Sequence, residues 1–449
     1  MRNATLFLAS VLLSAPAFAQ GGSIAVRGGK IMKADGSVID GGTMVIENGR
    51  ISSLGGADLE VPFDVILHEY PDAVIFPGFY EAHSSSGMDR ANENVAVAPF
   101  LNVKDSIDPV SFYFEDELRG GTVAIGIMPG NATVIGGHGR VVAPSGMTIE
   151  QMTLDTAMGM KIAIGPKRGW SRSTQLGELR ETFSKLDRDL RKLGLKLQEA
   201  GKQKEDFASV TEEEEEELSD GDAWDNAGGL LRFGDDFPGK DLISEEDLND
   251  GQRGLVNILN GDERLWIWAP SASDVVTAQN WLTEYGMLDN AVLVVTSAAW
   301  KASAQLAEMG RPVVISGDLW HVERDPVTYK EIRTFAPAKF EEAGIAFAIS
   351  SVEGRMGPDR LSYQAAMCIR EGVSRQVALA AVTTNPAKFW GLEDDLGDFK
   401  QGADGTFVVF DGDPLAISTH VLEVWIRGVK SYDRSEDARL KRLEEGRIK

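Results

Sequence analysis

Short apolar runs alternate with longer polar, helix-forming stretches along most of the chain. One run stops at Pro77-Gly78, and six more follow at residues 123–128, 161–164, 265–269, 292–295, 312–315 and 345–350. Buried strands that alternate with helices predict an α/β fold, and this number of strands favours a (β/α)8 barrel. The pattern supplies seven of the eight strands, and periodicity alone assigns no eighth.

The two ends of the chain have a different texture. Residues 22–73 hold short β-rich runs separated by glycine turns, and residues 406–433 repeat that pattern. Short alternating runs between turns predict a small antiparallel sheet. His68 and His420 fall in these segments, so we do not expect either histidine in a functional site.

A charged segment at about 177–222 interrupts the alternation. It is largely charged and helix-forming, and it ends in a run of glutamates at 212–217. A solvated long helix or acidic arm is favoured over a partner-binding element, because the segment holds too little apolar surface for a barrel core.

The N-terminus has the pattern of a secretory signal peptide. Arg2 precedes an apolar run at 6–13, and Ala17-Phe18-Ala19 supplies a cleavage site before Gln20. The alternative, a membrane anchor, needs about 20 apolar residues. We therefore expect residues 1–19 to be removed and the mature chain to be periplasmic or secreted.

Composition narrows the classes of partner. A net charge of −24 argues against nucleic acid and anionic membranes as partners. Cys368 is the only cysteine, so an intrachain disulfide cannot form, and its apolar neighbours predict a buried helix face.

The run that stops at Pro77-Gly78 is followed by Phe79-Tyr80-Glu81-Ala82-His83-Ser84-Ser85. This stretch resembles the first barrel strand of the amidohydrolase superfamily, where Pro-Gly-hydrophobic-hydrophobic-Asp-Ala-His-x-His supplies two zinc-binding histidines. Residues 384–394 and 397–404 resemble the closing signature of that family. The likeness is closest to the branch of imidazolonepropionase and related cyclic-amide hydrolases.

The resemblance implies a domain layout and an activity. It implies a (β/α)8 barrel over 76–389 with the charged helical insertion at about 177–222. Segments 20–75 and 390–435 would form a composite β-sandwich, followed by a charged tail at 436–449. The implied reaction is zinc-dependent hydrolysis of a C–N bond in a cyclic or small amide.

The zinc ligands of the family are largely replaced in this chain. His83 is the only ligand retained, and Ser85 stands where the second histidine is expected. Trp268, then Thr296 or Ser297, and then Ser351 or Val352 occupy the later ligand positions. Neutral hydroxyls are weak ligands, so we expect no metal and no other cofactor, although zinc is the norm in the family.

Other residues are candidates for chemistry. Lys161 at a strand end could be carboxylated to bridge metals, or simply pair with an acid. His321 with Asp318 is an acid/base candidate, and a surface loop histidine is the alternative. Asp105 and His138 are expected to line the pocket, with simple turn roles as the alternative.

Two hypotheses follow. In the first, an enzyme uses His83, His321, Asp318 and Lys161 on a small amide-type ligand in metal-free or single-metal chemistry. In the second, a catalytically silent barrel serves as a partner subunit or binding protein of an intact amidohydrolase, as a homo-oligomer or hetero-oligomer.

Overall fold

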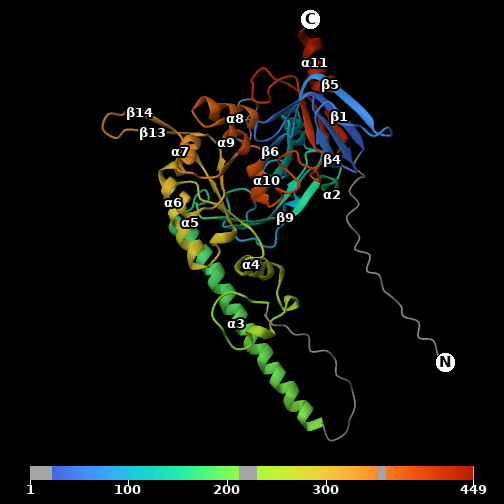
Figure 1. Ribbon diagram of the computed structural model, residues 1–449. Helices are drawn as coiled ribbons and strands as arrows, with labels where there is room; N and C mark the ends of the chain where they lie inside the picture. The colour runs from blue at the N-terminus through green and yellow to red at the C-terminus, as the bar shows by residue number, and fades with distance from the viewer. Residues whose placement is uncertain (1–22, 212–229, 352–359, 448–449) are drawn as a thin grey trace, which may run out of the picture.

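The protein, described by a computed structural model over residues 23–211, 230–351 and 360–447, is built on two eight-stranded sheets (Figure 1). The first sheet has the order β15-β12-β11-β10-β9-β8-β7-β6 and curves into a nearly closed barrel. At the seam, the Ser350 hydroxyl of β15 contacts the backbone oxygen of His83 on β6. The barrel strands are β6 (Phe79–Ser84), β7 (Thr122–Ile127), β8 (Ile135–Val142), β9 (Thr153–Ala163), β10 (Leu265–Trp268), β11 (Ala291–Val295), β12 (Val313–Ser316) and β15 (Phe347–Ser350).

The strand that periodicity does not assign is β8, which runs antiparallel to both β7 and β9. Glycines at 136, 137 and 139 interrupt its apolar pattern, so it lacks the sequence signature of a buried strand. Gly137 has φ of +91°, and a Cβ there would lie 2.4 Å from the backbone oxygen of Leu101. Glycine is required by this close approach. The barrel sheet is therefore mixed, not wholly parallel.

The expected first barrel strand is shifted along the chain. The run before Pro77 forms the end of β5 (Ile66–Phe76), which belongs to the second sheet, and the barrel begins after Gly78 with β6. Gly78 has φ of +87°, and a Cβ there would lie 2.6 Å from the Val123 side chain. The Pro-Gly pair thus separates two sheets, where the apolar pattern suggested one strand.

The second sheet joins strands from both ends of the chain. Its order is β18-β17-β16-β5-β1-β3-β4, with β2 paired to β1. β5 is parallel to β1 and antiparallel to β16, so it links the N-terminal and C-terminal strands. The other strands of this sheet are β1 (Ile24–Met32), β2 (Val38–Asp40), β3 (Thr43–Glu47), β4 (Arg50–Gly55), β16 (Phe407–Phe410), β17 (Val421–Ile426) and β18 (Val429–Asp433).

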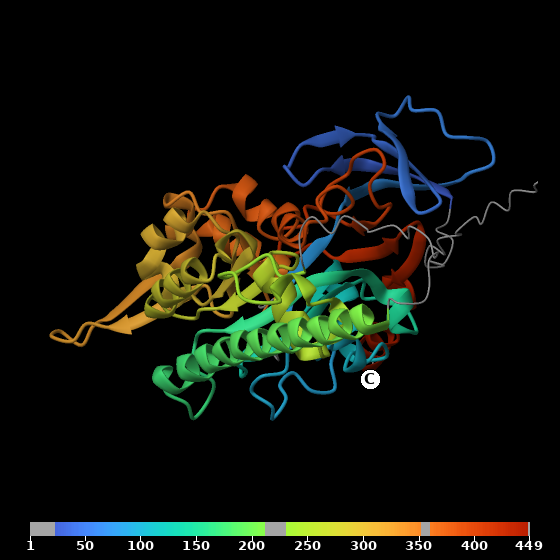
Figure 2. The same ribbon diagram turned by 90° about the horizontal axis from the view of Figure 1, so that it is seen from below.

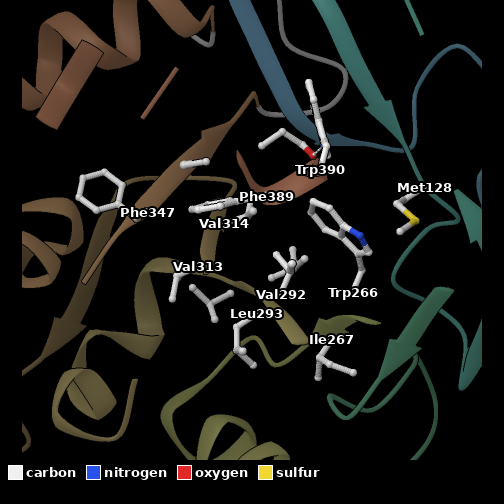
Figure 3. Close-up of a cluster of buried hydrophobic side chains, with 14 of the residues drawn as sticks. Met128, Trp266, Ile267, Val292, Leu293, Val313, Val314, Phe347, Phe389 and Trp390 are labelled. Atoms are coloured by element: carbon white, nitrogen blue, oxygen red, sulfur yellow. Dashed lines mark hydrogen bonds between the residues drawn. The ribbon is translucent and has the colours of Figure 1, made fainter. Parts of the chain in front are cut away.

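Helices cover the outside of the barrel, and its interior is filled by apolar side chains. Figure 3 shows Trp266, Val292 and Phe347 from three different strands within this core. Cys368 is buried on α8, which confirms the expectation for it. The helices are α1 (Phe112–Gly120), α2 (Ile149–Met152), α3 (Arg172–Thr211), α4 (Asp250–Asn260), α5 (Ala272–Glu284), α6 (Ser303–Met309), α7 (Ala336–Glu342), α8 (Leu361–Arg370), α9 (Arg375–Ala380), α10 (Thr384–Trp390) and α11 (Ala438–Arg447).

Helix α3 corrects the expectation that the charged segment buries little apolar surface. Leu179, Phe183, Leu186 and Leu190 are buried in the main core, at helical spacing on one face. The Phe183 ring lies 5.4 Å from that of Trp281. Figures 1 and 2 show α3 running along the body of the protein before its far end extends beyond it. The apolar stripe is narrow and the rest of the helix is highly charged, so the composition of the segment does not reveal the stripe.

We predict that Phe183→Ala lowers the free energy of unfolding by about 3–4 kcal/mol, because it removes a buried aromatic ring. Leu195→Ala, at a half-exposed position on the same helix, should cost less than about 1 kcal/mol. Urea unfolding of both variants measures the difference. Equal, small losses in the two variants would show that α3 does not pack on the barrel as described.

Several expectations concern residues outside the described ranges. They include the signal peptide at 1–19, the stretch 212–222 of the charged segment, and Val352. Within the described part of the chain, no helix has the length and apolar character needed to cross a membrane.

Candidate functional site

Three barrel strands bring four polar side chains together at the barrel centre. His83 and Glu81 come from β6, Lys161 from β9 and Ser350 from β15. All four are at most 3% exposed. We call these four residues the barrel-centre cluster. Their burial means that every polar atom among them needs a partner within the protein.

His83 and Lys161 form the closest contact in the cluster, with 2.7 Å between Nε2 and Nζ. A lysine ammonium has only donors, so Nε2 of His83 accepts and its Nδ1 carries the ring proton. Burial, and then the charge of Lys161, lowers the pKa of His83 well below its ordinary range. His83 is therefore a neutral hydrogen-bond acceptor at neutral pH.

Two indole rings close around this pair. The Trp266 ring lies 6.1 Å from the His83 ring, and its Nε1 donates to the Met158 backbone oxygen at 2.8 Å. Lys161 Nζ lies 5.8 Å from the ring centroid of Trp268, within the range of a cation–π contact. Trp268 thus occupies space beside the lysine, at a position where the resemblance called for a zinc ligand.

Glu81 is the second feature of the cluster. Its Oε1 accepts a hydrogen bond from the Ser350 hydroxyl at 2.6 Å, and its Oε2 accepts one from the Ser351 backbone N–H at 2.8 Å. Burial, helped by the charge of Glu117, raises the pKa of Glu81 to about 7. A carboxyl group that titrates near neutrality can act as a general acid or base.

The sequence-based assignment of candidate residues overlooked Glu81. A signal was available, because Glu81-Ala82-His83 matches the Asp-Ala-His of the family pattern with glutamate in place of aspartate. Glu81 was not assigned because the zinc ligands of this motif are its histidines. Ser351, expected near the pocket, enters the site through its backbone N–H.

The residues at the expected zinc positions have other roles in the structure. The Thr296 hydroxyl donates to the Pro270 backbone oxygen at 2.7 Å, and the Ser297 hydroxyl donates to that of Trp320 at 3.2 Å. Ser85 is buried and directly follows β6, the strand that carries Glu81 and His83. Across residues 23–211, 230–351 and 360–447, no group of three or more His, Cys, Asp or Glu side chains could hold a metal ion. The side chains in these residues therefore do not supply the three or four ligands that a zinc site needs.

His321 and Asp318 lie elsewhere. His321 is on β13 (Trp320–Arg324), which pairs with β14 (Glu331–Phe335) in a hairpin that projects from the barrel (Figure 1). Its Nε2 lies 3.7 Å from Glu323 Oε2. Asp318 is exposed in the connection before this hairpin. The structure therefore does not bring this pair into the barrel-centre cluster.

His138 is on β8, and Asp105 lies in the segment that precedes α1. His138 Nδ1 is 2.6 Å from Glu263 Oε1, and its Nε2 is 2.9 Å from the Pro99 backbone oxygen. Burial lowers the pKa of His138, but the contact with Glu263 outweighs it and the net shift is upward. Asp105 ends a short 3-10 helix (Val103–Asp105) and lines a cavity with Arg90.

The fold is a (β/α)8-type barrel with a β-domain built from both chain ends. Comparisons with known proteins find this architecture among amidohydrolases. A model of the Amidohydrolase family matches residues 266–432. Amidohydrolase tasK of Hapsidospora irregularis is 23% identical over 420 residues, covering 87% of this chain. The chain spans only 40% of the length of that relative.

Solved structures share the fold. An amidohydrolase from Thermotoga maritima MSB8 superposes with a TM-score of 0.70 at 24% identity, covering 92% of this chain and all of that chain. An adenosine deaminase from Xanthomonas campestris, solved with bound zinc, gives 0.50 at 15% identity, covering 96% of this chain and 98% of that one. These structures show that the chain has the fold of amidohydrolases, and the matched segment and the relative support its resemblance to the amidohydrolase superfamily.

Proposed function

We propose that this chain is an exported amidohydrolase-superfamily barrel that has lost zinc-dependent hydrolysis. It would serve as a binding protein for a small amide-type ligand, or as a partner subunit of a related intact amidohydrolase. Fold alone does not imply activity, so the proposal rests on the barrel-centre cluster.

The contact between Lys161 and His83 carries the proposal. Zinc binding through Nε2 of the retained histidine would need the lone pair that Lys161 engages at 2.7 Å. A lysine ammonium at that distance also repels a divalent cation. Trp268 and the hydroxyl residues at the other family positions add no strong ligand.

A second candidate function, hydrolysis of a C–N bond in a cyclic or small amide without zinc, is favoured by Glu81. Its pKa of about 7 suits a group that takes a proton from water and returns it to a leaving amine. Its complete burial opposes this role, because substrate must come within hydrogen-bond reach of the carboxyl group.

Turnover of a panel of hydantoins, lactams and N-acyl amino acids by the purified mature chain distinguishes these functions. The first proposal predicts no turnover, with or without a chelator, while an intact zinc amidohydrolase run in parallel is active. Chelator-sensitive turnover that disappears in His83→Ala would contradict it. Chelator-insensitive turnover that disappears in Glu81→Gln would support the second candidate instead.

Export is the remaining part of the proposal. The apolar run at 6–13 and the Ala17-Phe18-Ala19 site support cleavage after Ala19. Intact-mass analysis of the natural protein from the periplasm or medium should give a chain that begins at Gln20. A cytoplasmic chain that retains residues 1–19 would refute export.

A further inference from the structure

A cavity of about 480 Å³ lies between the barrel and the second sheet. The end of α1, the start of α8 and the loop that joins β16 to β17 form its walls. Its lining residues are distinct from the barrel-centre cluster. A volume of this size matches the range of pockets that hold small organic ligands.

Arginine side chains converge on this cavity, which we call the arginine cavity. Arg119 is neutralised by Asp437 at 2.6 Å and Asp116 at 2.7 Å. Arg360 donates to the Arg119 backbone oxygen at 3.1 Å. The charge of Arg360 acts on Glu117, and that of Arg434 acts on Asp411. Within the described part of the chain, however, neither guanidinium group has a carboxylate oxygen within ion-pair distance. Both groups therefore retain hydrogen-bond donors for an anion.

A group of arginines around one cavity is unusual in a chain that is strongly acidic overall. The chain as a whole carries a net charge of −24, so a lack of acidic residues does not explain why these two guanidinium groups have no carboxylate in direct contact. His420 also lines the cavity, and its Nδ1 lies 2.9 Å from Asp411 Oδ2, which occupies that nearby carboxylate. Arginine suits carboxylate recognition because its planar fork can donate two parallel hydrogen bonds.

The opposite wall of the cavity is apolar. Phe410, Leu415 and Ile417 contribute it, and Ile417 at the rim is 89% exposed. An apolar side chain held in water beside a cavity gains free energy when a ligand covers it. The arginine cavity therefore combines cationic groups with an apolar surface, and both can contact one amphipathic ligand.

We propose that the arginine cavity binds a small organic anion, a carboxylate carried on an apolar body. The carboxylate pairs with Arg360 and Arg434, and the body packs against Phe410, Leu415 and Ile417. This site lies outside the barrel centre and is independent of whether the barrel hydrolyses amides.

Calorimetric titration of the mature chain with octanoate tests this proposal. We expect binding with Kd on the order of 0.1–1 mM, as for a small ligand with one charged contact point. Octanamide, which has the same body without the charge, should bind at least about tenfold more weakly. Inorganic phosphate should also bind at least about tenfold more weakly, because it lacks the apolar body.

Variants locate the site. Arg434→Gln and Arg360→Gln should each weaken octanoate binding about tenfold or more, since each removes a charge-assisted hydrogen bond. Arg324→Gln, at an exposed arginine of the β13 hairpin, is the matched control and should leave the affinity unchanged. Unchanged urea unfolding would show that the variants fold. Equal binding of octanamide, unaltered affinity in both cavity variants, or no binding at millimolar octanoate would overturn the proposal.

Discussion

Replacing His83 with alanine is expected to lower the free energy of unfolding by about 3–4 kcal/mol. The substitution removes a buried imidazole and leaves a cavity beside Trp266. It also removes one acceptor of Lys161 Nζ, and the loss of a hydrogen bond to a buried charged donor is costly. Urea unfolding at pH 7 measures the loss.

The matched variant His83→Gln retains a side-chain carbonyl that can accept from Lys161, so it should cost less than about 2 kcal/mol. A double-mutant cycle with Lys161→Met isolates the pair, and we expect a coupling of about 1–3 kcal/mol. The double variant should therefore be more stable than the sum of the single losses implies. A loss below about 1 kcal/mol in His83→Ala would contradict the described contact.

Stability should also depend on pH through Glu81. The pKa of about 7 in the folded protein lies above the ordinary value of 4.5, so the folded state holds a proton that the unfolded state releases. This contribution is fully present below about pH 4.5 and is lost as the pH rises through about 7. Between pH 4.5 and 8 the loss should total about 3 kcal/mol.

The control for this prediction is Glu81→Gln, which keeps the size of the side chain and cannot titrate. The difference in unfolding free energy between wild type and Glu81→Gln removes the contribution of all other titrating groups. Relative to the variant, wild type should lose stability as the pH rises. A difference that stays constant from pH 5 to 8 would show that the carboxyl group is not held in this environment.

The sequence predicted the fold where local patterns suffice. Apolar runs identify most barrel strands, because a strand buried on both faces is apolar throughout its length. β8 does not meet this criterion because glycines interrupt its apolar run. Gly137 is needed there because the backbone of Leu101 approaches it closely. The apolar stripe of α3 was present in the sequence, yet the surrounding charges dominated the composition of the segment.

The candidate site was predictable in part. His83 followed from a motif, and Glu81 could have followed from the same motif. The contact of His83 with Lys161 could not, because β6 and β9 are separated in the barrel by β7 and β8. Which side chains meet across a barrel depends on strand order and register, and the unassigned antiparallel β8 lies between these two strands.

We expect that the retained family histidine pairs with Lys161 and does not bind zinc. Elemental analysis of the purified mature chain, dialysed gently without chelator, measures this. We predict well below one equivalent of zinc per chain, and the same content in wild type and His83→Ala. One equivalent of zinc in wild type that is lost in His83→Ala would contradict the account.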